Sequence, residues 1–180
     1  MQHTVNRTHH HDQQQQGFLY VLDNKGSTLP GWPLQMGEIQ AQPVVVDLNN
    51  DGWLEVVVAD VRGNVAAFDR LGRELWERHL ASMVTQAPTV GDVDGDGALE
   101  LVIGTGSGRI MALRAADGAS VPGFPVMARG KIMAPLSIVK LRDDARGQHI
   151  IAPAFDGVLY IVDASGACGR WVVVLRISPL

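Results

Sequence analysis

Two acidic stretches hold the side chains of this chain whose types and spacing could do chemistry. The first reads DLNNDGWLE over residues 47–55, and the second reads DVDGDGALE over residues 92–100. Each has Asp or Asn at positions 1, 3 and 5, glycine at position 6 and glutamate at position 9. The glycine permits a sharp turn with positive φ, so that the three preceding side chains can point at one centre. Oxygen ligands at this spacing indicate a calcium-binding loop.

Calcium suits these ligands better than other divalent ions do. Four side chains and the carbonyl oxygen of position 7 would give roughly six oxygens, whereas Mg²⁺ prefers a smaller octahedral shell that keeps its waters. Neither stretch contains Cys or His, which argues against zinc. We therefore predict two Ca²⁺ sites. Their ligands are Asp47, Asn49, Asp51, Trp53 and Glu55 in the first loop, and Asp92, Asp94, Asp96, Ala98 and Glu100 in the second.

The two sites should differ in affinity, and a third stretch should lack an ion. The first loop has three carboxylates and the second has four, so we expect the second to bind more tightly. The corresponding stretch of residues 140–149, KLRDDARGQH, has lost the alternation and carries Lys140, Arg142 and Arg146. The alternative is that both acidic loops are only Asp- and Gly-rich hairpin turns. Their recurrence in phase with a longer repeat argues against this alternative.

That repeat is about 45 residues long and sets the place of both loops. Asp47 and Asp92 start the loops, and Gly63 and Gly108 each follow a loop start by 16 residues. The first unit divides into four short segments, PVVVDL, LEVVVAD, NVAAFD and RELWERHL, separated by turn residues. Such short, nearly continuous apolar runs indicate strands buried on both faces. Four strands in a unit of this length are typical of one blade of a β-propeller.

The predicted fold class is therefore all-β, a β-propeller segment of about three four-stranded blades plus a half blade. Residues 17–37 would supply the last two strands of a preceding blade, and the third unit would run from about 134 to 176. Propellers usually close with four to eight blades, so we expect a segment of a larger ring. The expected organisation is a disordered, low-complexity tail over 1–16, blades over 17–170, and a last strand or unrelated tail over 171–180.

Composition excludes several classes of function. The 180 residues are 46% hydrophobic and 19% charged, a mixture that folds. The net charge is −4 without a basic stripe, so nucleic acid is not an expected partner. No apolar run reaches the roughly 18 residues of a membrane span, and this segment is not expected to contact a membrane. The single cysteine, Cys168, forms no internal disulfide and leaves the compartment open.

The acidic loops and the blades around them resemble known families. Asp-x-Asp/Asn-x-Asp-Gly-x-x-Glu loops inside propeller blades resemble the FG-GAP repeats of integrin α-subunits. Stretches such as QAQPVVVDLNNDGWLEVVVAD and PTVGDVDGDGALELVIGTGSGRIMALR look like the plant and algal proteins called defective in exine formation. This similarity extends over about residues 17–168. It includes the altered third unit with FDGVLYIVD.

The resemblance implies a protein of the secretory pathway that is linked to patterning of the pollen wall. Its luminal or extracellular propeller would bind calcium, and one C-terminal helix would cross the membrane. Neither a signal peptide nor such a helix is found in this sequence, so we expect a fragment of a longer product. The family's calcium ligands match the eight predicted ligand side chains one for one, namely Asp47, Asn49, Asp51, Glu55, Asp92, Asp94, Asp96 and Glu100.

Three functional hypotheses remain open. The first is a non-catalytic binding module that contacts proteins or cell-wall polysaccharide, with the exposed faces of Trp32, Trp53 or Trp76 as possible sugar platforms. The second is a propeller enzyme, quinoprotein-like or hydrolytic, for which no Ser, His and Asp stand at a motif spacing. GTGSG at 104–108 leads into an expected strand, so it lacks the helix terminus of a phosphate loop. The third is a structural spacer that calcium stabilises.

Overall fold

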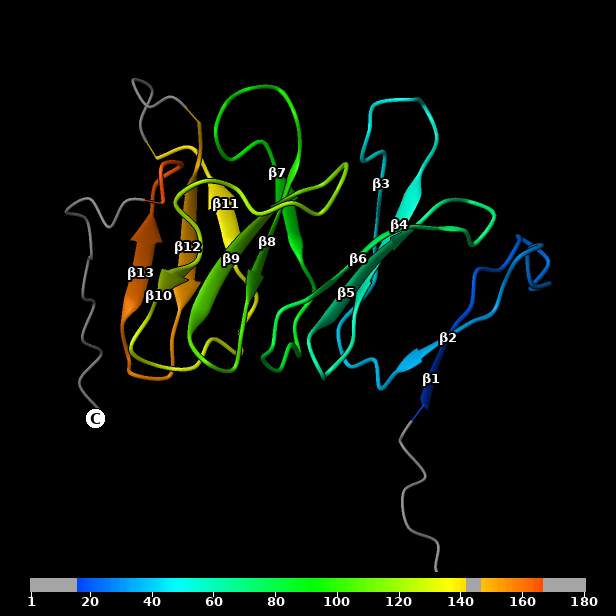
Figure 1. The fold of residues 1–180 in the computed structure, drawn as a ribbon, viewed down its shortest axis with the longest axis horizontal. Coiled ribbons are helices and arrows are strands. Elements are labelled where there is room, and N and C mark those ends of the chain that lie inside the picture. The colour runs from blue at the N-terminus through cyan, green and yellow to red at the C-terminus, as the bar shows by residue number, and fades with distance from the viewer. Residues whose placement is uncertain (1–15, 142–146, 167–180) are drawn as a thin grey trace, which may run out of the picture.

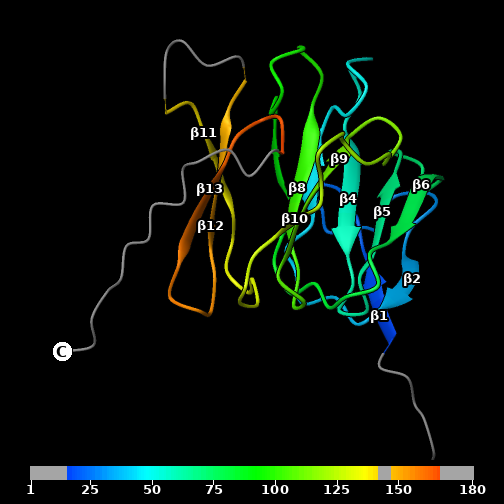
Figure 2. The same ribbon diagram turned by 60° about the vertical axis from the view of Figure 1, so that its left-hand side comes forward.

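The computed structural model describes residues 16–141 and 147–166, and these form four antiparallel sheets with no helix among them. The expectations for the tail of residues 1–15, for Arg142 and Arg146, and for Cys168 and the strand over 171–180 fall outside the described residues. Figures 1 and 2 show the four sheets following one another across the molecule in chain order. In the described part, no helix is long and apolar enough to cross a membrane.

Two of the sheets are complete four-stranded blades. In both, each strand pairs with the next one along the chain. The first complete blade consists of β3 (Val44–Val46), β4 (Glu55–Ala59), β5 (Asn64–Phe68) and β6 (Glu74–His79). The second consists of β7 (Thr89–Gly91), β8 (Glu100–Gly104), β9 (Arg109–Arg114) and β10 (Val126–Met127).

The two sheets at the ends have fewer strands in the described part of the chain. The half blade contains β1 (Gln16–Leu19) and β2 (Leu34–Gly37). The last sheet contains β11 (Ser137–Val139), β12 (His149–Pro153) and β13 (Leu159–Val162). This arrangement confirms the predicted all-β fold of successive blades with a half blade at the start.

The blades are held together by apolar side chains on both faces of their central strands. Every residue of β4 and of β8 is buried. Val56 and Val58 face the half blade, whereas Val57 and Ala59 face the second complete blade, because successive side chains of a strand point to opposite faces. Burial on both faces of the strands therefore explains the nearly continuous apolar runs, as predicted.

Two of the candidate sugar platforms are part of this packing. Trp76 of β6 is buried, and its indole N–H donates a hydrogen bond to the carbonyl oxygen of Ala115 in the next blade at 2.9 Å. Trp32 is also buried and meets Phe68 edge to face, with ring centroids 6.2 Å apart. Of the three tryptophans considered, only Trp53 offers an exposed ring, at 59%.

Candidate metal centre

Both acidic loops connect the first strand of a blade to the second. Residues 47–54 join β3 to β4, and residues 92–99 join β7 to β8. The register places Val46 opposite Glu55 and Gly91 opposite Glu100. The hairpin therefore brings the glutamate at position 9 back beside the aspartate at position 1. Both loops project from the same edge of the molecule, at the top of Figure 1.

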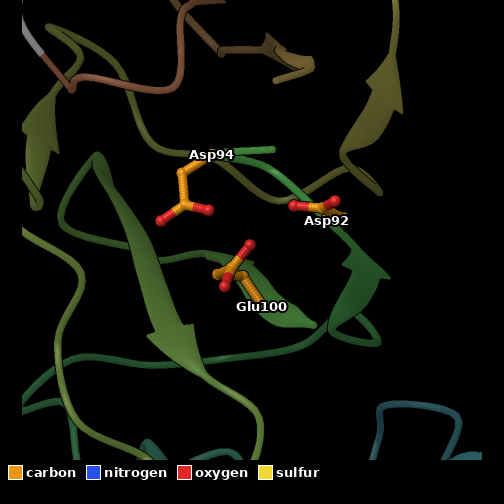
Figure 3. Close-up of side chains that lie close together, drawn as sticks. All are labelled: Asp92, Asp94 and Glu100. Atoms are coloured by element: carbon orange, nitrogen blue, oxygen red, sulfur yellow. The ribbon is translucent and has the colours of Figure 1, made fainter. Parts of the chain in front are cut away.

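The second loop brings three carboxylates together. Asp92, Asp94 and Glu100 each offer an oxygen, and these oxygens all lie within 4.8 Å of one another. Figure 3 shows the three carboxyl groups facing a common space. Among the described residues, no other three His, Cys, Asp or Glu side chains form such a group. Oxygens at this separation can bind one hard cation such as Ca²⁺.

Backbone N–H groups hold these carboxylates in place. Asp92 accepts hydrogen bonds from the N–H groups of Gly95 at 2.7 Å and of Asp96 and Gly97 at 3.1 Å. Asp94 accepts a further bond from the Asp96 N–H at 3.1 Å. Gly97, at position 6, has φ +92°, as does Gly52 in the first loop at +88°. This confirms the positive φ predicted for both glycines.

Asp96, the fourth predicted acidic ligand, is not one of the three clustered carboxylates. Its Oδ1 accepts a hydrogen bond from the N–H group of Ala98 at 2.7 Å, which closes a local turn of the kind that Asp side chains favour. Ligation by Asp96 and by the Ala98 carbonyl oxygen therefore remains a prediction.

Glu100 is the buried member of the cluster, with only 1% of its surface exposed. Its Oε2 accepts a hydrogen bond from the N–H group of Val93 at 2.7 Å. Burial raises the pKa of Glu100 to about 7, and the carboxylates of Asp94, Asp96 and Asp92 add to the rise, although the Val93 N–H opposes it. A bound cation would reverse this repulsion and favour the ionised form.

The first loop repeats most of this hydrogen bonding with one change. Glu55 is 3% exposed, and its Oε2 accepts from the Leu48 N–H at 2.8 Å. Asp47 accepts from the N–H groups of Asp51 at 3.1 Å and Gly52 at 2.8 Å. Desolvation raises the pKa of Asp47, but the backbone N–H donors outweigh it and hold that pKa below its usual value. In both loops, the carboxylates at positions 1 and 9 thus accept hydrogen bonds from backbone N–H groups of the loop.

The change in the first loop is at position 3. The Asn49 side-chain N–H donates to Asp51 Oδ2 at 3.0 Å, and Asp51 Oδ1 accepts from the Trp53 N–H at 2.8 Å. The amide therefore draws Asp51 into a local pair instead of adding a negative charge to the centre. The exposed Trp53 ring lies under the Arg70 guanidinium, whose carbon is 4.5 Å from the ring centroid.

In the third loop, two residues of different chemistry occupy the positions of the end ligands. β11 and β12 pair Val139 with His149, so Lys140 stands where Asp47 and Asp92 stand. His149 is at the position of Glu55 and Glu100. The strand register thus agrees with the predicted correspondence of residues 140–149 to the two acidic loops, although the residues between the two ends have no matching pattern. The prediction that this loop holds no ion stays untested.

The stretch at 104–108 is a hairpin turn between two strands. It joins β8 to β9, and the Gly108 N–H donates to the carbonyl oxygen of Thr105 at 3.0 Å. No helix follows it, so the helix terminus that binds phosphate is missing here. The interpretation as a turn is confirmed.

Comparison with known proteins supports the repeat and the fold. Residues 47–103, which contain both acidic loops, match the model of the FG-GAP-like repeat family. BamB from Moraxella catarrhalis is similar in structure at a TM-score of 0.51 and 21% identity, over 78% of this chain and 38% of that one. No curated protein matches the sequence.

Two further structures show the same fold similarity. BBS1N in complex with ARL6DN, from a crystal soaked with lead, has a TM-score of 0.54 and 15% identity, over 82% of this chain and 42% of that one. The same complex soaked with mercury has a TM-score of 0.52 and 15% identity, over 84% and 43% of the two chains. The chain thus spans about two fifths of the proteins that it matches. Residues 47–103 are thus similar to FG-GAP-like repeats and lie within a segment of a β-propeller.

Proposed function

We propose that the chain is a calcium-binding, non-catalytic part of a β-propeller, in which the ion joins the first two strands of a blade. The observation that carries this proposal is the group of Asp92, Asp94 and Glu100, whose oxygens lie within 4.8 Å of one another. The repeat of the loop 45 residues earlier supports a second, weaker site. FG-GAP repeats, which the matched region resembles, are known for calcium loops of this kind.

The proposal predicts that calcium stabilises the folded chain. An ion that binds only the folded state raises the free energy of unfolding by mass action. The cluster contains one buried and two partly buried carboxylates, and relief of their mutual repulsion is part of the favourable free energy of calcium binding. Extracellular calcium modules commonly bind in the range of roughly 10⁻⁴ to 10⁻³ M.

Calorimetric titration of calcium into the purified chain tests the proposal, with magnesium as the competing ion. Asp94→Asn removes one charge from the cluster but keeps an oxygen that can accept the Asp96 N–H. Asp23→Asn is the matched control, since Asp23 accepts backbone N–H groups in an exposed turn far along the chain from the loops. We expect Asp94→Asn to lose the tighter site and Asp23→Asn to titrate like the parent. A parent that gives no heat and no rise in Tm while remaining folded would exclude the proposal.

The place and partners of the module are the finer part of the proposal. By its resemblance to exine-formation and integrin-like proteins, the propeller would face the lumen or the cell exterior and contact proteins or cell-wall polysaccharide. The exposed Trp53 ring is the side chain best suited to stack on a sugar. Cosedimentation with pectin, comparing the parent with Trp53→Ala, tests this part, and equal recovery of both proteins would count against it.

A further inference from the structure

The second acidic loop is in direct contact with the last sheet. The Gln148 N–H donates a hydrogen bond to the carbonyl oxygen of Val93 at 2.8 Å. Gly147 has φ +88°, and a methyl group added to it would overlap that same oxygen and come within 2.9 Å of the carbonyl carbon of Asp94. The backbone of Gly147 and Gln148 therefore lies against the segment between two members of the carboxylate cluster.

The side chain of Gln148 reaches the other side of Asp92. Its Oε1 lies 3.1 Å from the place that a Cβ on Gly91 would occupy, so it covers the backbone just before Asp92. Gly147 and Gln148 thus contact the chain on both sides of this carboxylate. Because Gly147 combines a positive φ with close backbone contact, a larger residue there must displace one of the two segments.

The first loop lacks this hydrogen bond, although Leu99 of the next blade packs against the apolar cluster that contains Leu48. Leu48 and Leu99 occupy the positions of Val93 and Gln148, and no hydrogen bond joins them in the described part of the chain. The two loops are therefore similar in sequence, but only the second accepts a backbone hydrogen bond at this position from the sheet that follows it.

We propose that Gly147 and Gln148 are positioning residues for the calcium site of the second loop, so that calcium binding there depends on docking of the last sheet. The inference rests on the proposed calcium function. Neither residue needs to touch the ion, because both act through the backbone that carries Asp92 and Asp94. By the same linkage, calcium bound in the second loop stabilises the contact between the two sheets.

Two glycine variants test the inference. Gly147→Ala pushes on the loop, whereas Gly157→Ala is its matched control, since Gly157 also has a positive φ of +75° but nothing lies within 4 Å of the added methyl group. Groups that orient metal ligands without touching the metal typically change affinity by roughly 10- to 100-fold. We expect Gly147→Ala to weaken the tighter calcium site by roughly tenfold or more and Gly157→Ala to leave it unchanged. Gln148→Ala, which removes only the side chain, should show a smaller loss in the same direction.

Terbium luminescence separates this effect from general destabilisation. Trp53 lies in the first loop and Ala98 at the same position of the second, so energy transfer from Trp53 reports a lanthanide in the first loop. Trp53→Phe identifies this part of the signal. We expect Gly147→Ala to keep the Trp53-sensitised titration of the parent while its tighter calorimetric site weakens.

The outcomes distinguish the inference from the function on which it rests. If Gly147→Ala and Gln148→Ala bind calcium at the second loop as tightly as Gly157→Ala, the two residues do not position the site, and the inference is wrong. If Gly147→Ala weakens both loops equally, its effect is general and the inference is again wrong. A folded parent that binds no calcium overturns the proposed function itself, and the inference with it.

Discussion

At the scale of single residues, Glu100 combines two roles that conflict. It is buried and accepts the Val93 N–H at 2.7 Å, which satisfies a backbone donor that the loop would otherwise leave unpaired. It also stands beside two other carboxylates. The first role needs only an acceptor, whereas the second needs a negative charge and an ion that compensates it. Substitutions can therefore separate the two roles.

Glu100→Gln should remove the charge and keep the acceptor. We expect the calcium affinity of the second loop to fall by roughly tenfold or more. The calcium-free variant should match the parent in stability near pH 5, where Glu100 of the folded parent is protonated, and exceed it at pH 8. Glu100→Ala also leaves the buried Val93 N–H unpaired, which costs about 1–3 kcal/mol. Urea unfolding in EDTA measures this difference. Equal calcium-free stabilities of the two variants would contradict the structural role of Glu100.

The raised pKa of Glu100 predicts a pH dependence whose sign changes with calcium. In the calcium-free chain the pKa of this group rises from 4.5 to about 7 on folding, so the folded state holds a proton in this window that the unfolded chain has released. The resulting stabilisation is present below pH 4.5 and disappears as the pH rises through about 7. In saturating calcium the order reverses, because protons compete with the ion.

Thermal unfolding between pH 5 and 8 checks this pH dependence. Glu100→Gln is the reference, because its Tm changes with pH only through the other titratable groups. In EDTA, the Tm of the parent relative to Glu100→Gln should rise as the pH falls. In saturating calcium, the Tm of the parent relative to Glu100→Gln should decrease as the pH falls. A relative Tm that does not change with pH in EDTA would show that Glu100 ionises normally in the folded chain.

At the scale of strands and loops, the sequence predicted what depends on local pattern. The blades, the half blade and the positive φ of Gly52 and Gly97 follow from short apolar runs and turn residues that recur in phase. The approach of Gly147 to the loop of residues 92–100 could not be predicted in this way. It depends on how two sheets dock, and no residue spacing within one unit records it.

The same limit applied to the acidic loops themselves. The sequence treats Asp94 and Asp96 as equivalent ligands, and each accepts the N–H group two residues further on, but only Asp94 lies with Asp92 and Glu100 in the carboxylate cluster. By contrast, the strand register agrees with the alignment of residues 140–149, which already placed His149 where Glu100 stands. Spacing in the sequence therefore predicted the register, but it did not predict which carboxylates lie close together in the folded hairpin.

Trp76 of β6 gives a prediction about contact between blades. Trp76→Phe keeps most of the packing and loses the indole hydrogen bond to Ala115, so it should cost about 1 kcal/mol. Trp76→Ala also leaves a cavity and should cost about 3–5 kcal/mol. Denaturant unfolding measures both free energies. A sugar-binding role without a structural one would leave the stability of both variants unchanged.

At the scale of the whole molecule, the half blade leaves part of the next blade uncovered. Val45 of β3 is 58% exposed and Leu54 is 57% exposed. The equivalent residues one blade later, Val90 and Leu99, pack against the core between the two complete blades. Val45 and Leu54 line an apolar groove of about 360 Å³ between the half blade and the first complete blade. At Val90 and Leu99, the covering core includes residues of β3 and β4, the first two strands of the preceding blade. The half blade contains only two strands in the described part of the chain.

The pair Val45 and Val90 tests this difference between equivalent positions. Val90→Asp places a charge in a packed interface and should destabilise the chain by several kcal/mol, on the order of 2–4. Val45→Asp places it in an open groove and should change the stability by no more than about 0.5 kcal/mol. Urea unfolding of the chain of 180 residues measures both. Equal losses would show that Val45 is covered in solution.

The most direct test of the calcium account is a calcium titration followed by NMR of the backbone amides. The account predicts shifts concentrated at residues 92–100, weaker shifts at 47–55 that need more calcium, and none at the ordinary turn of residues 104–108. Magnesium at the same concentrations should not reproduce them. A folded chain whose amides at 92–100 do not respond to calcium would contradict the central claim.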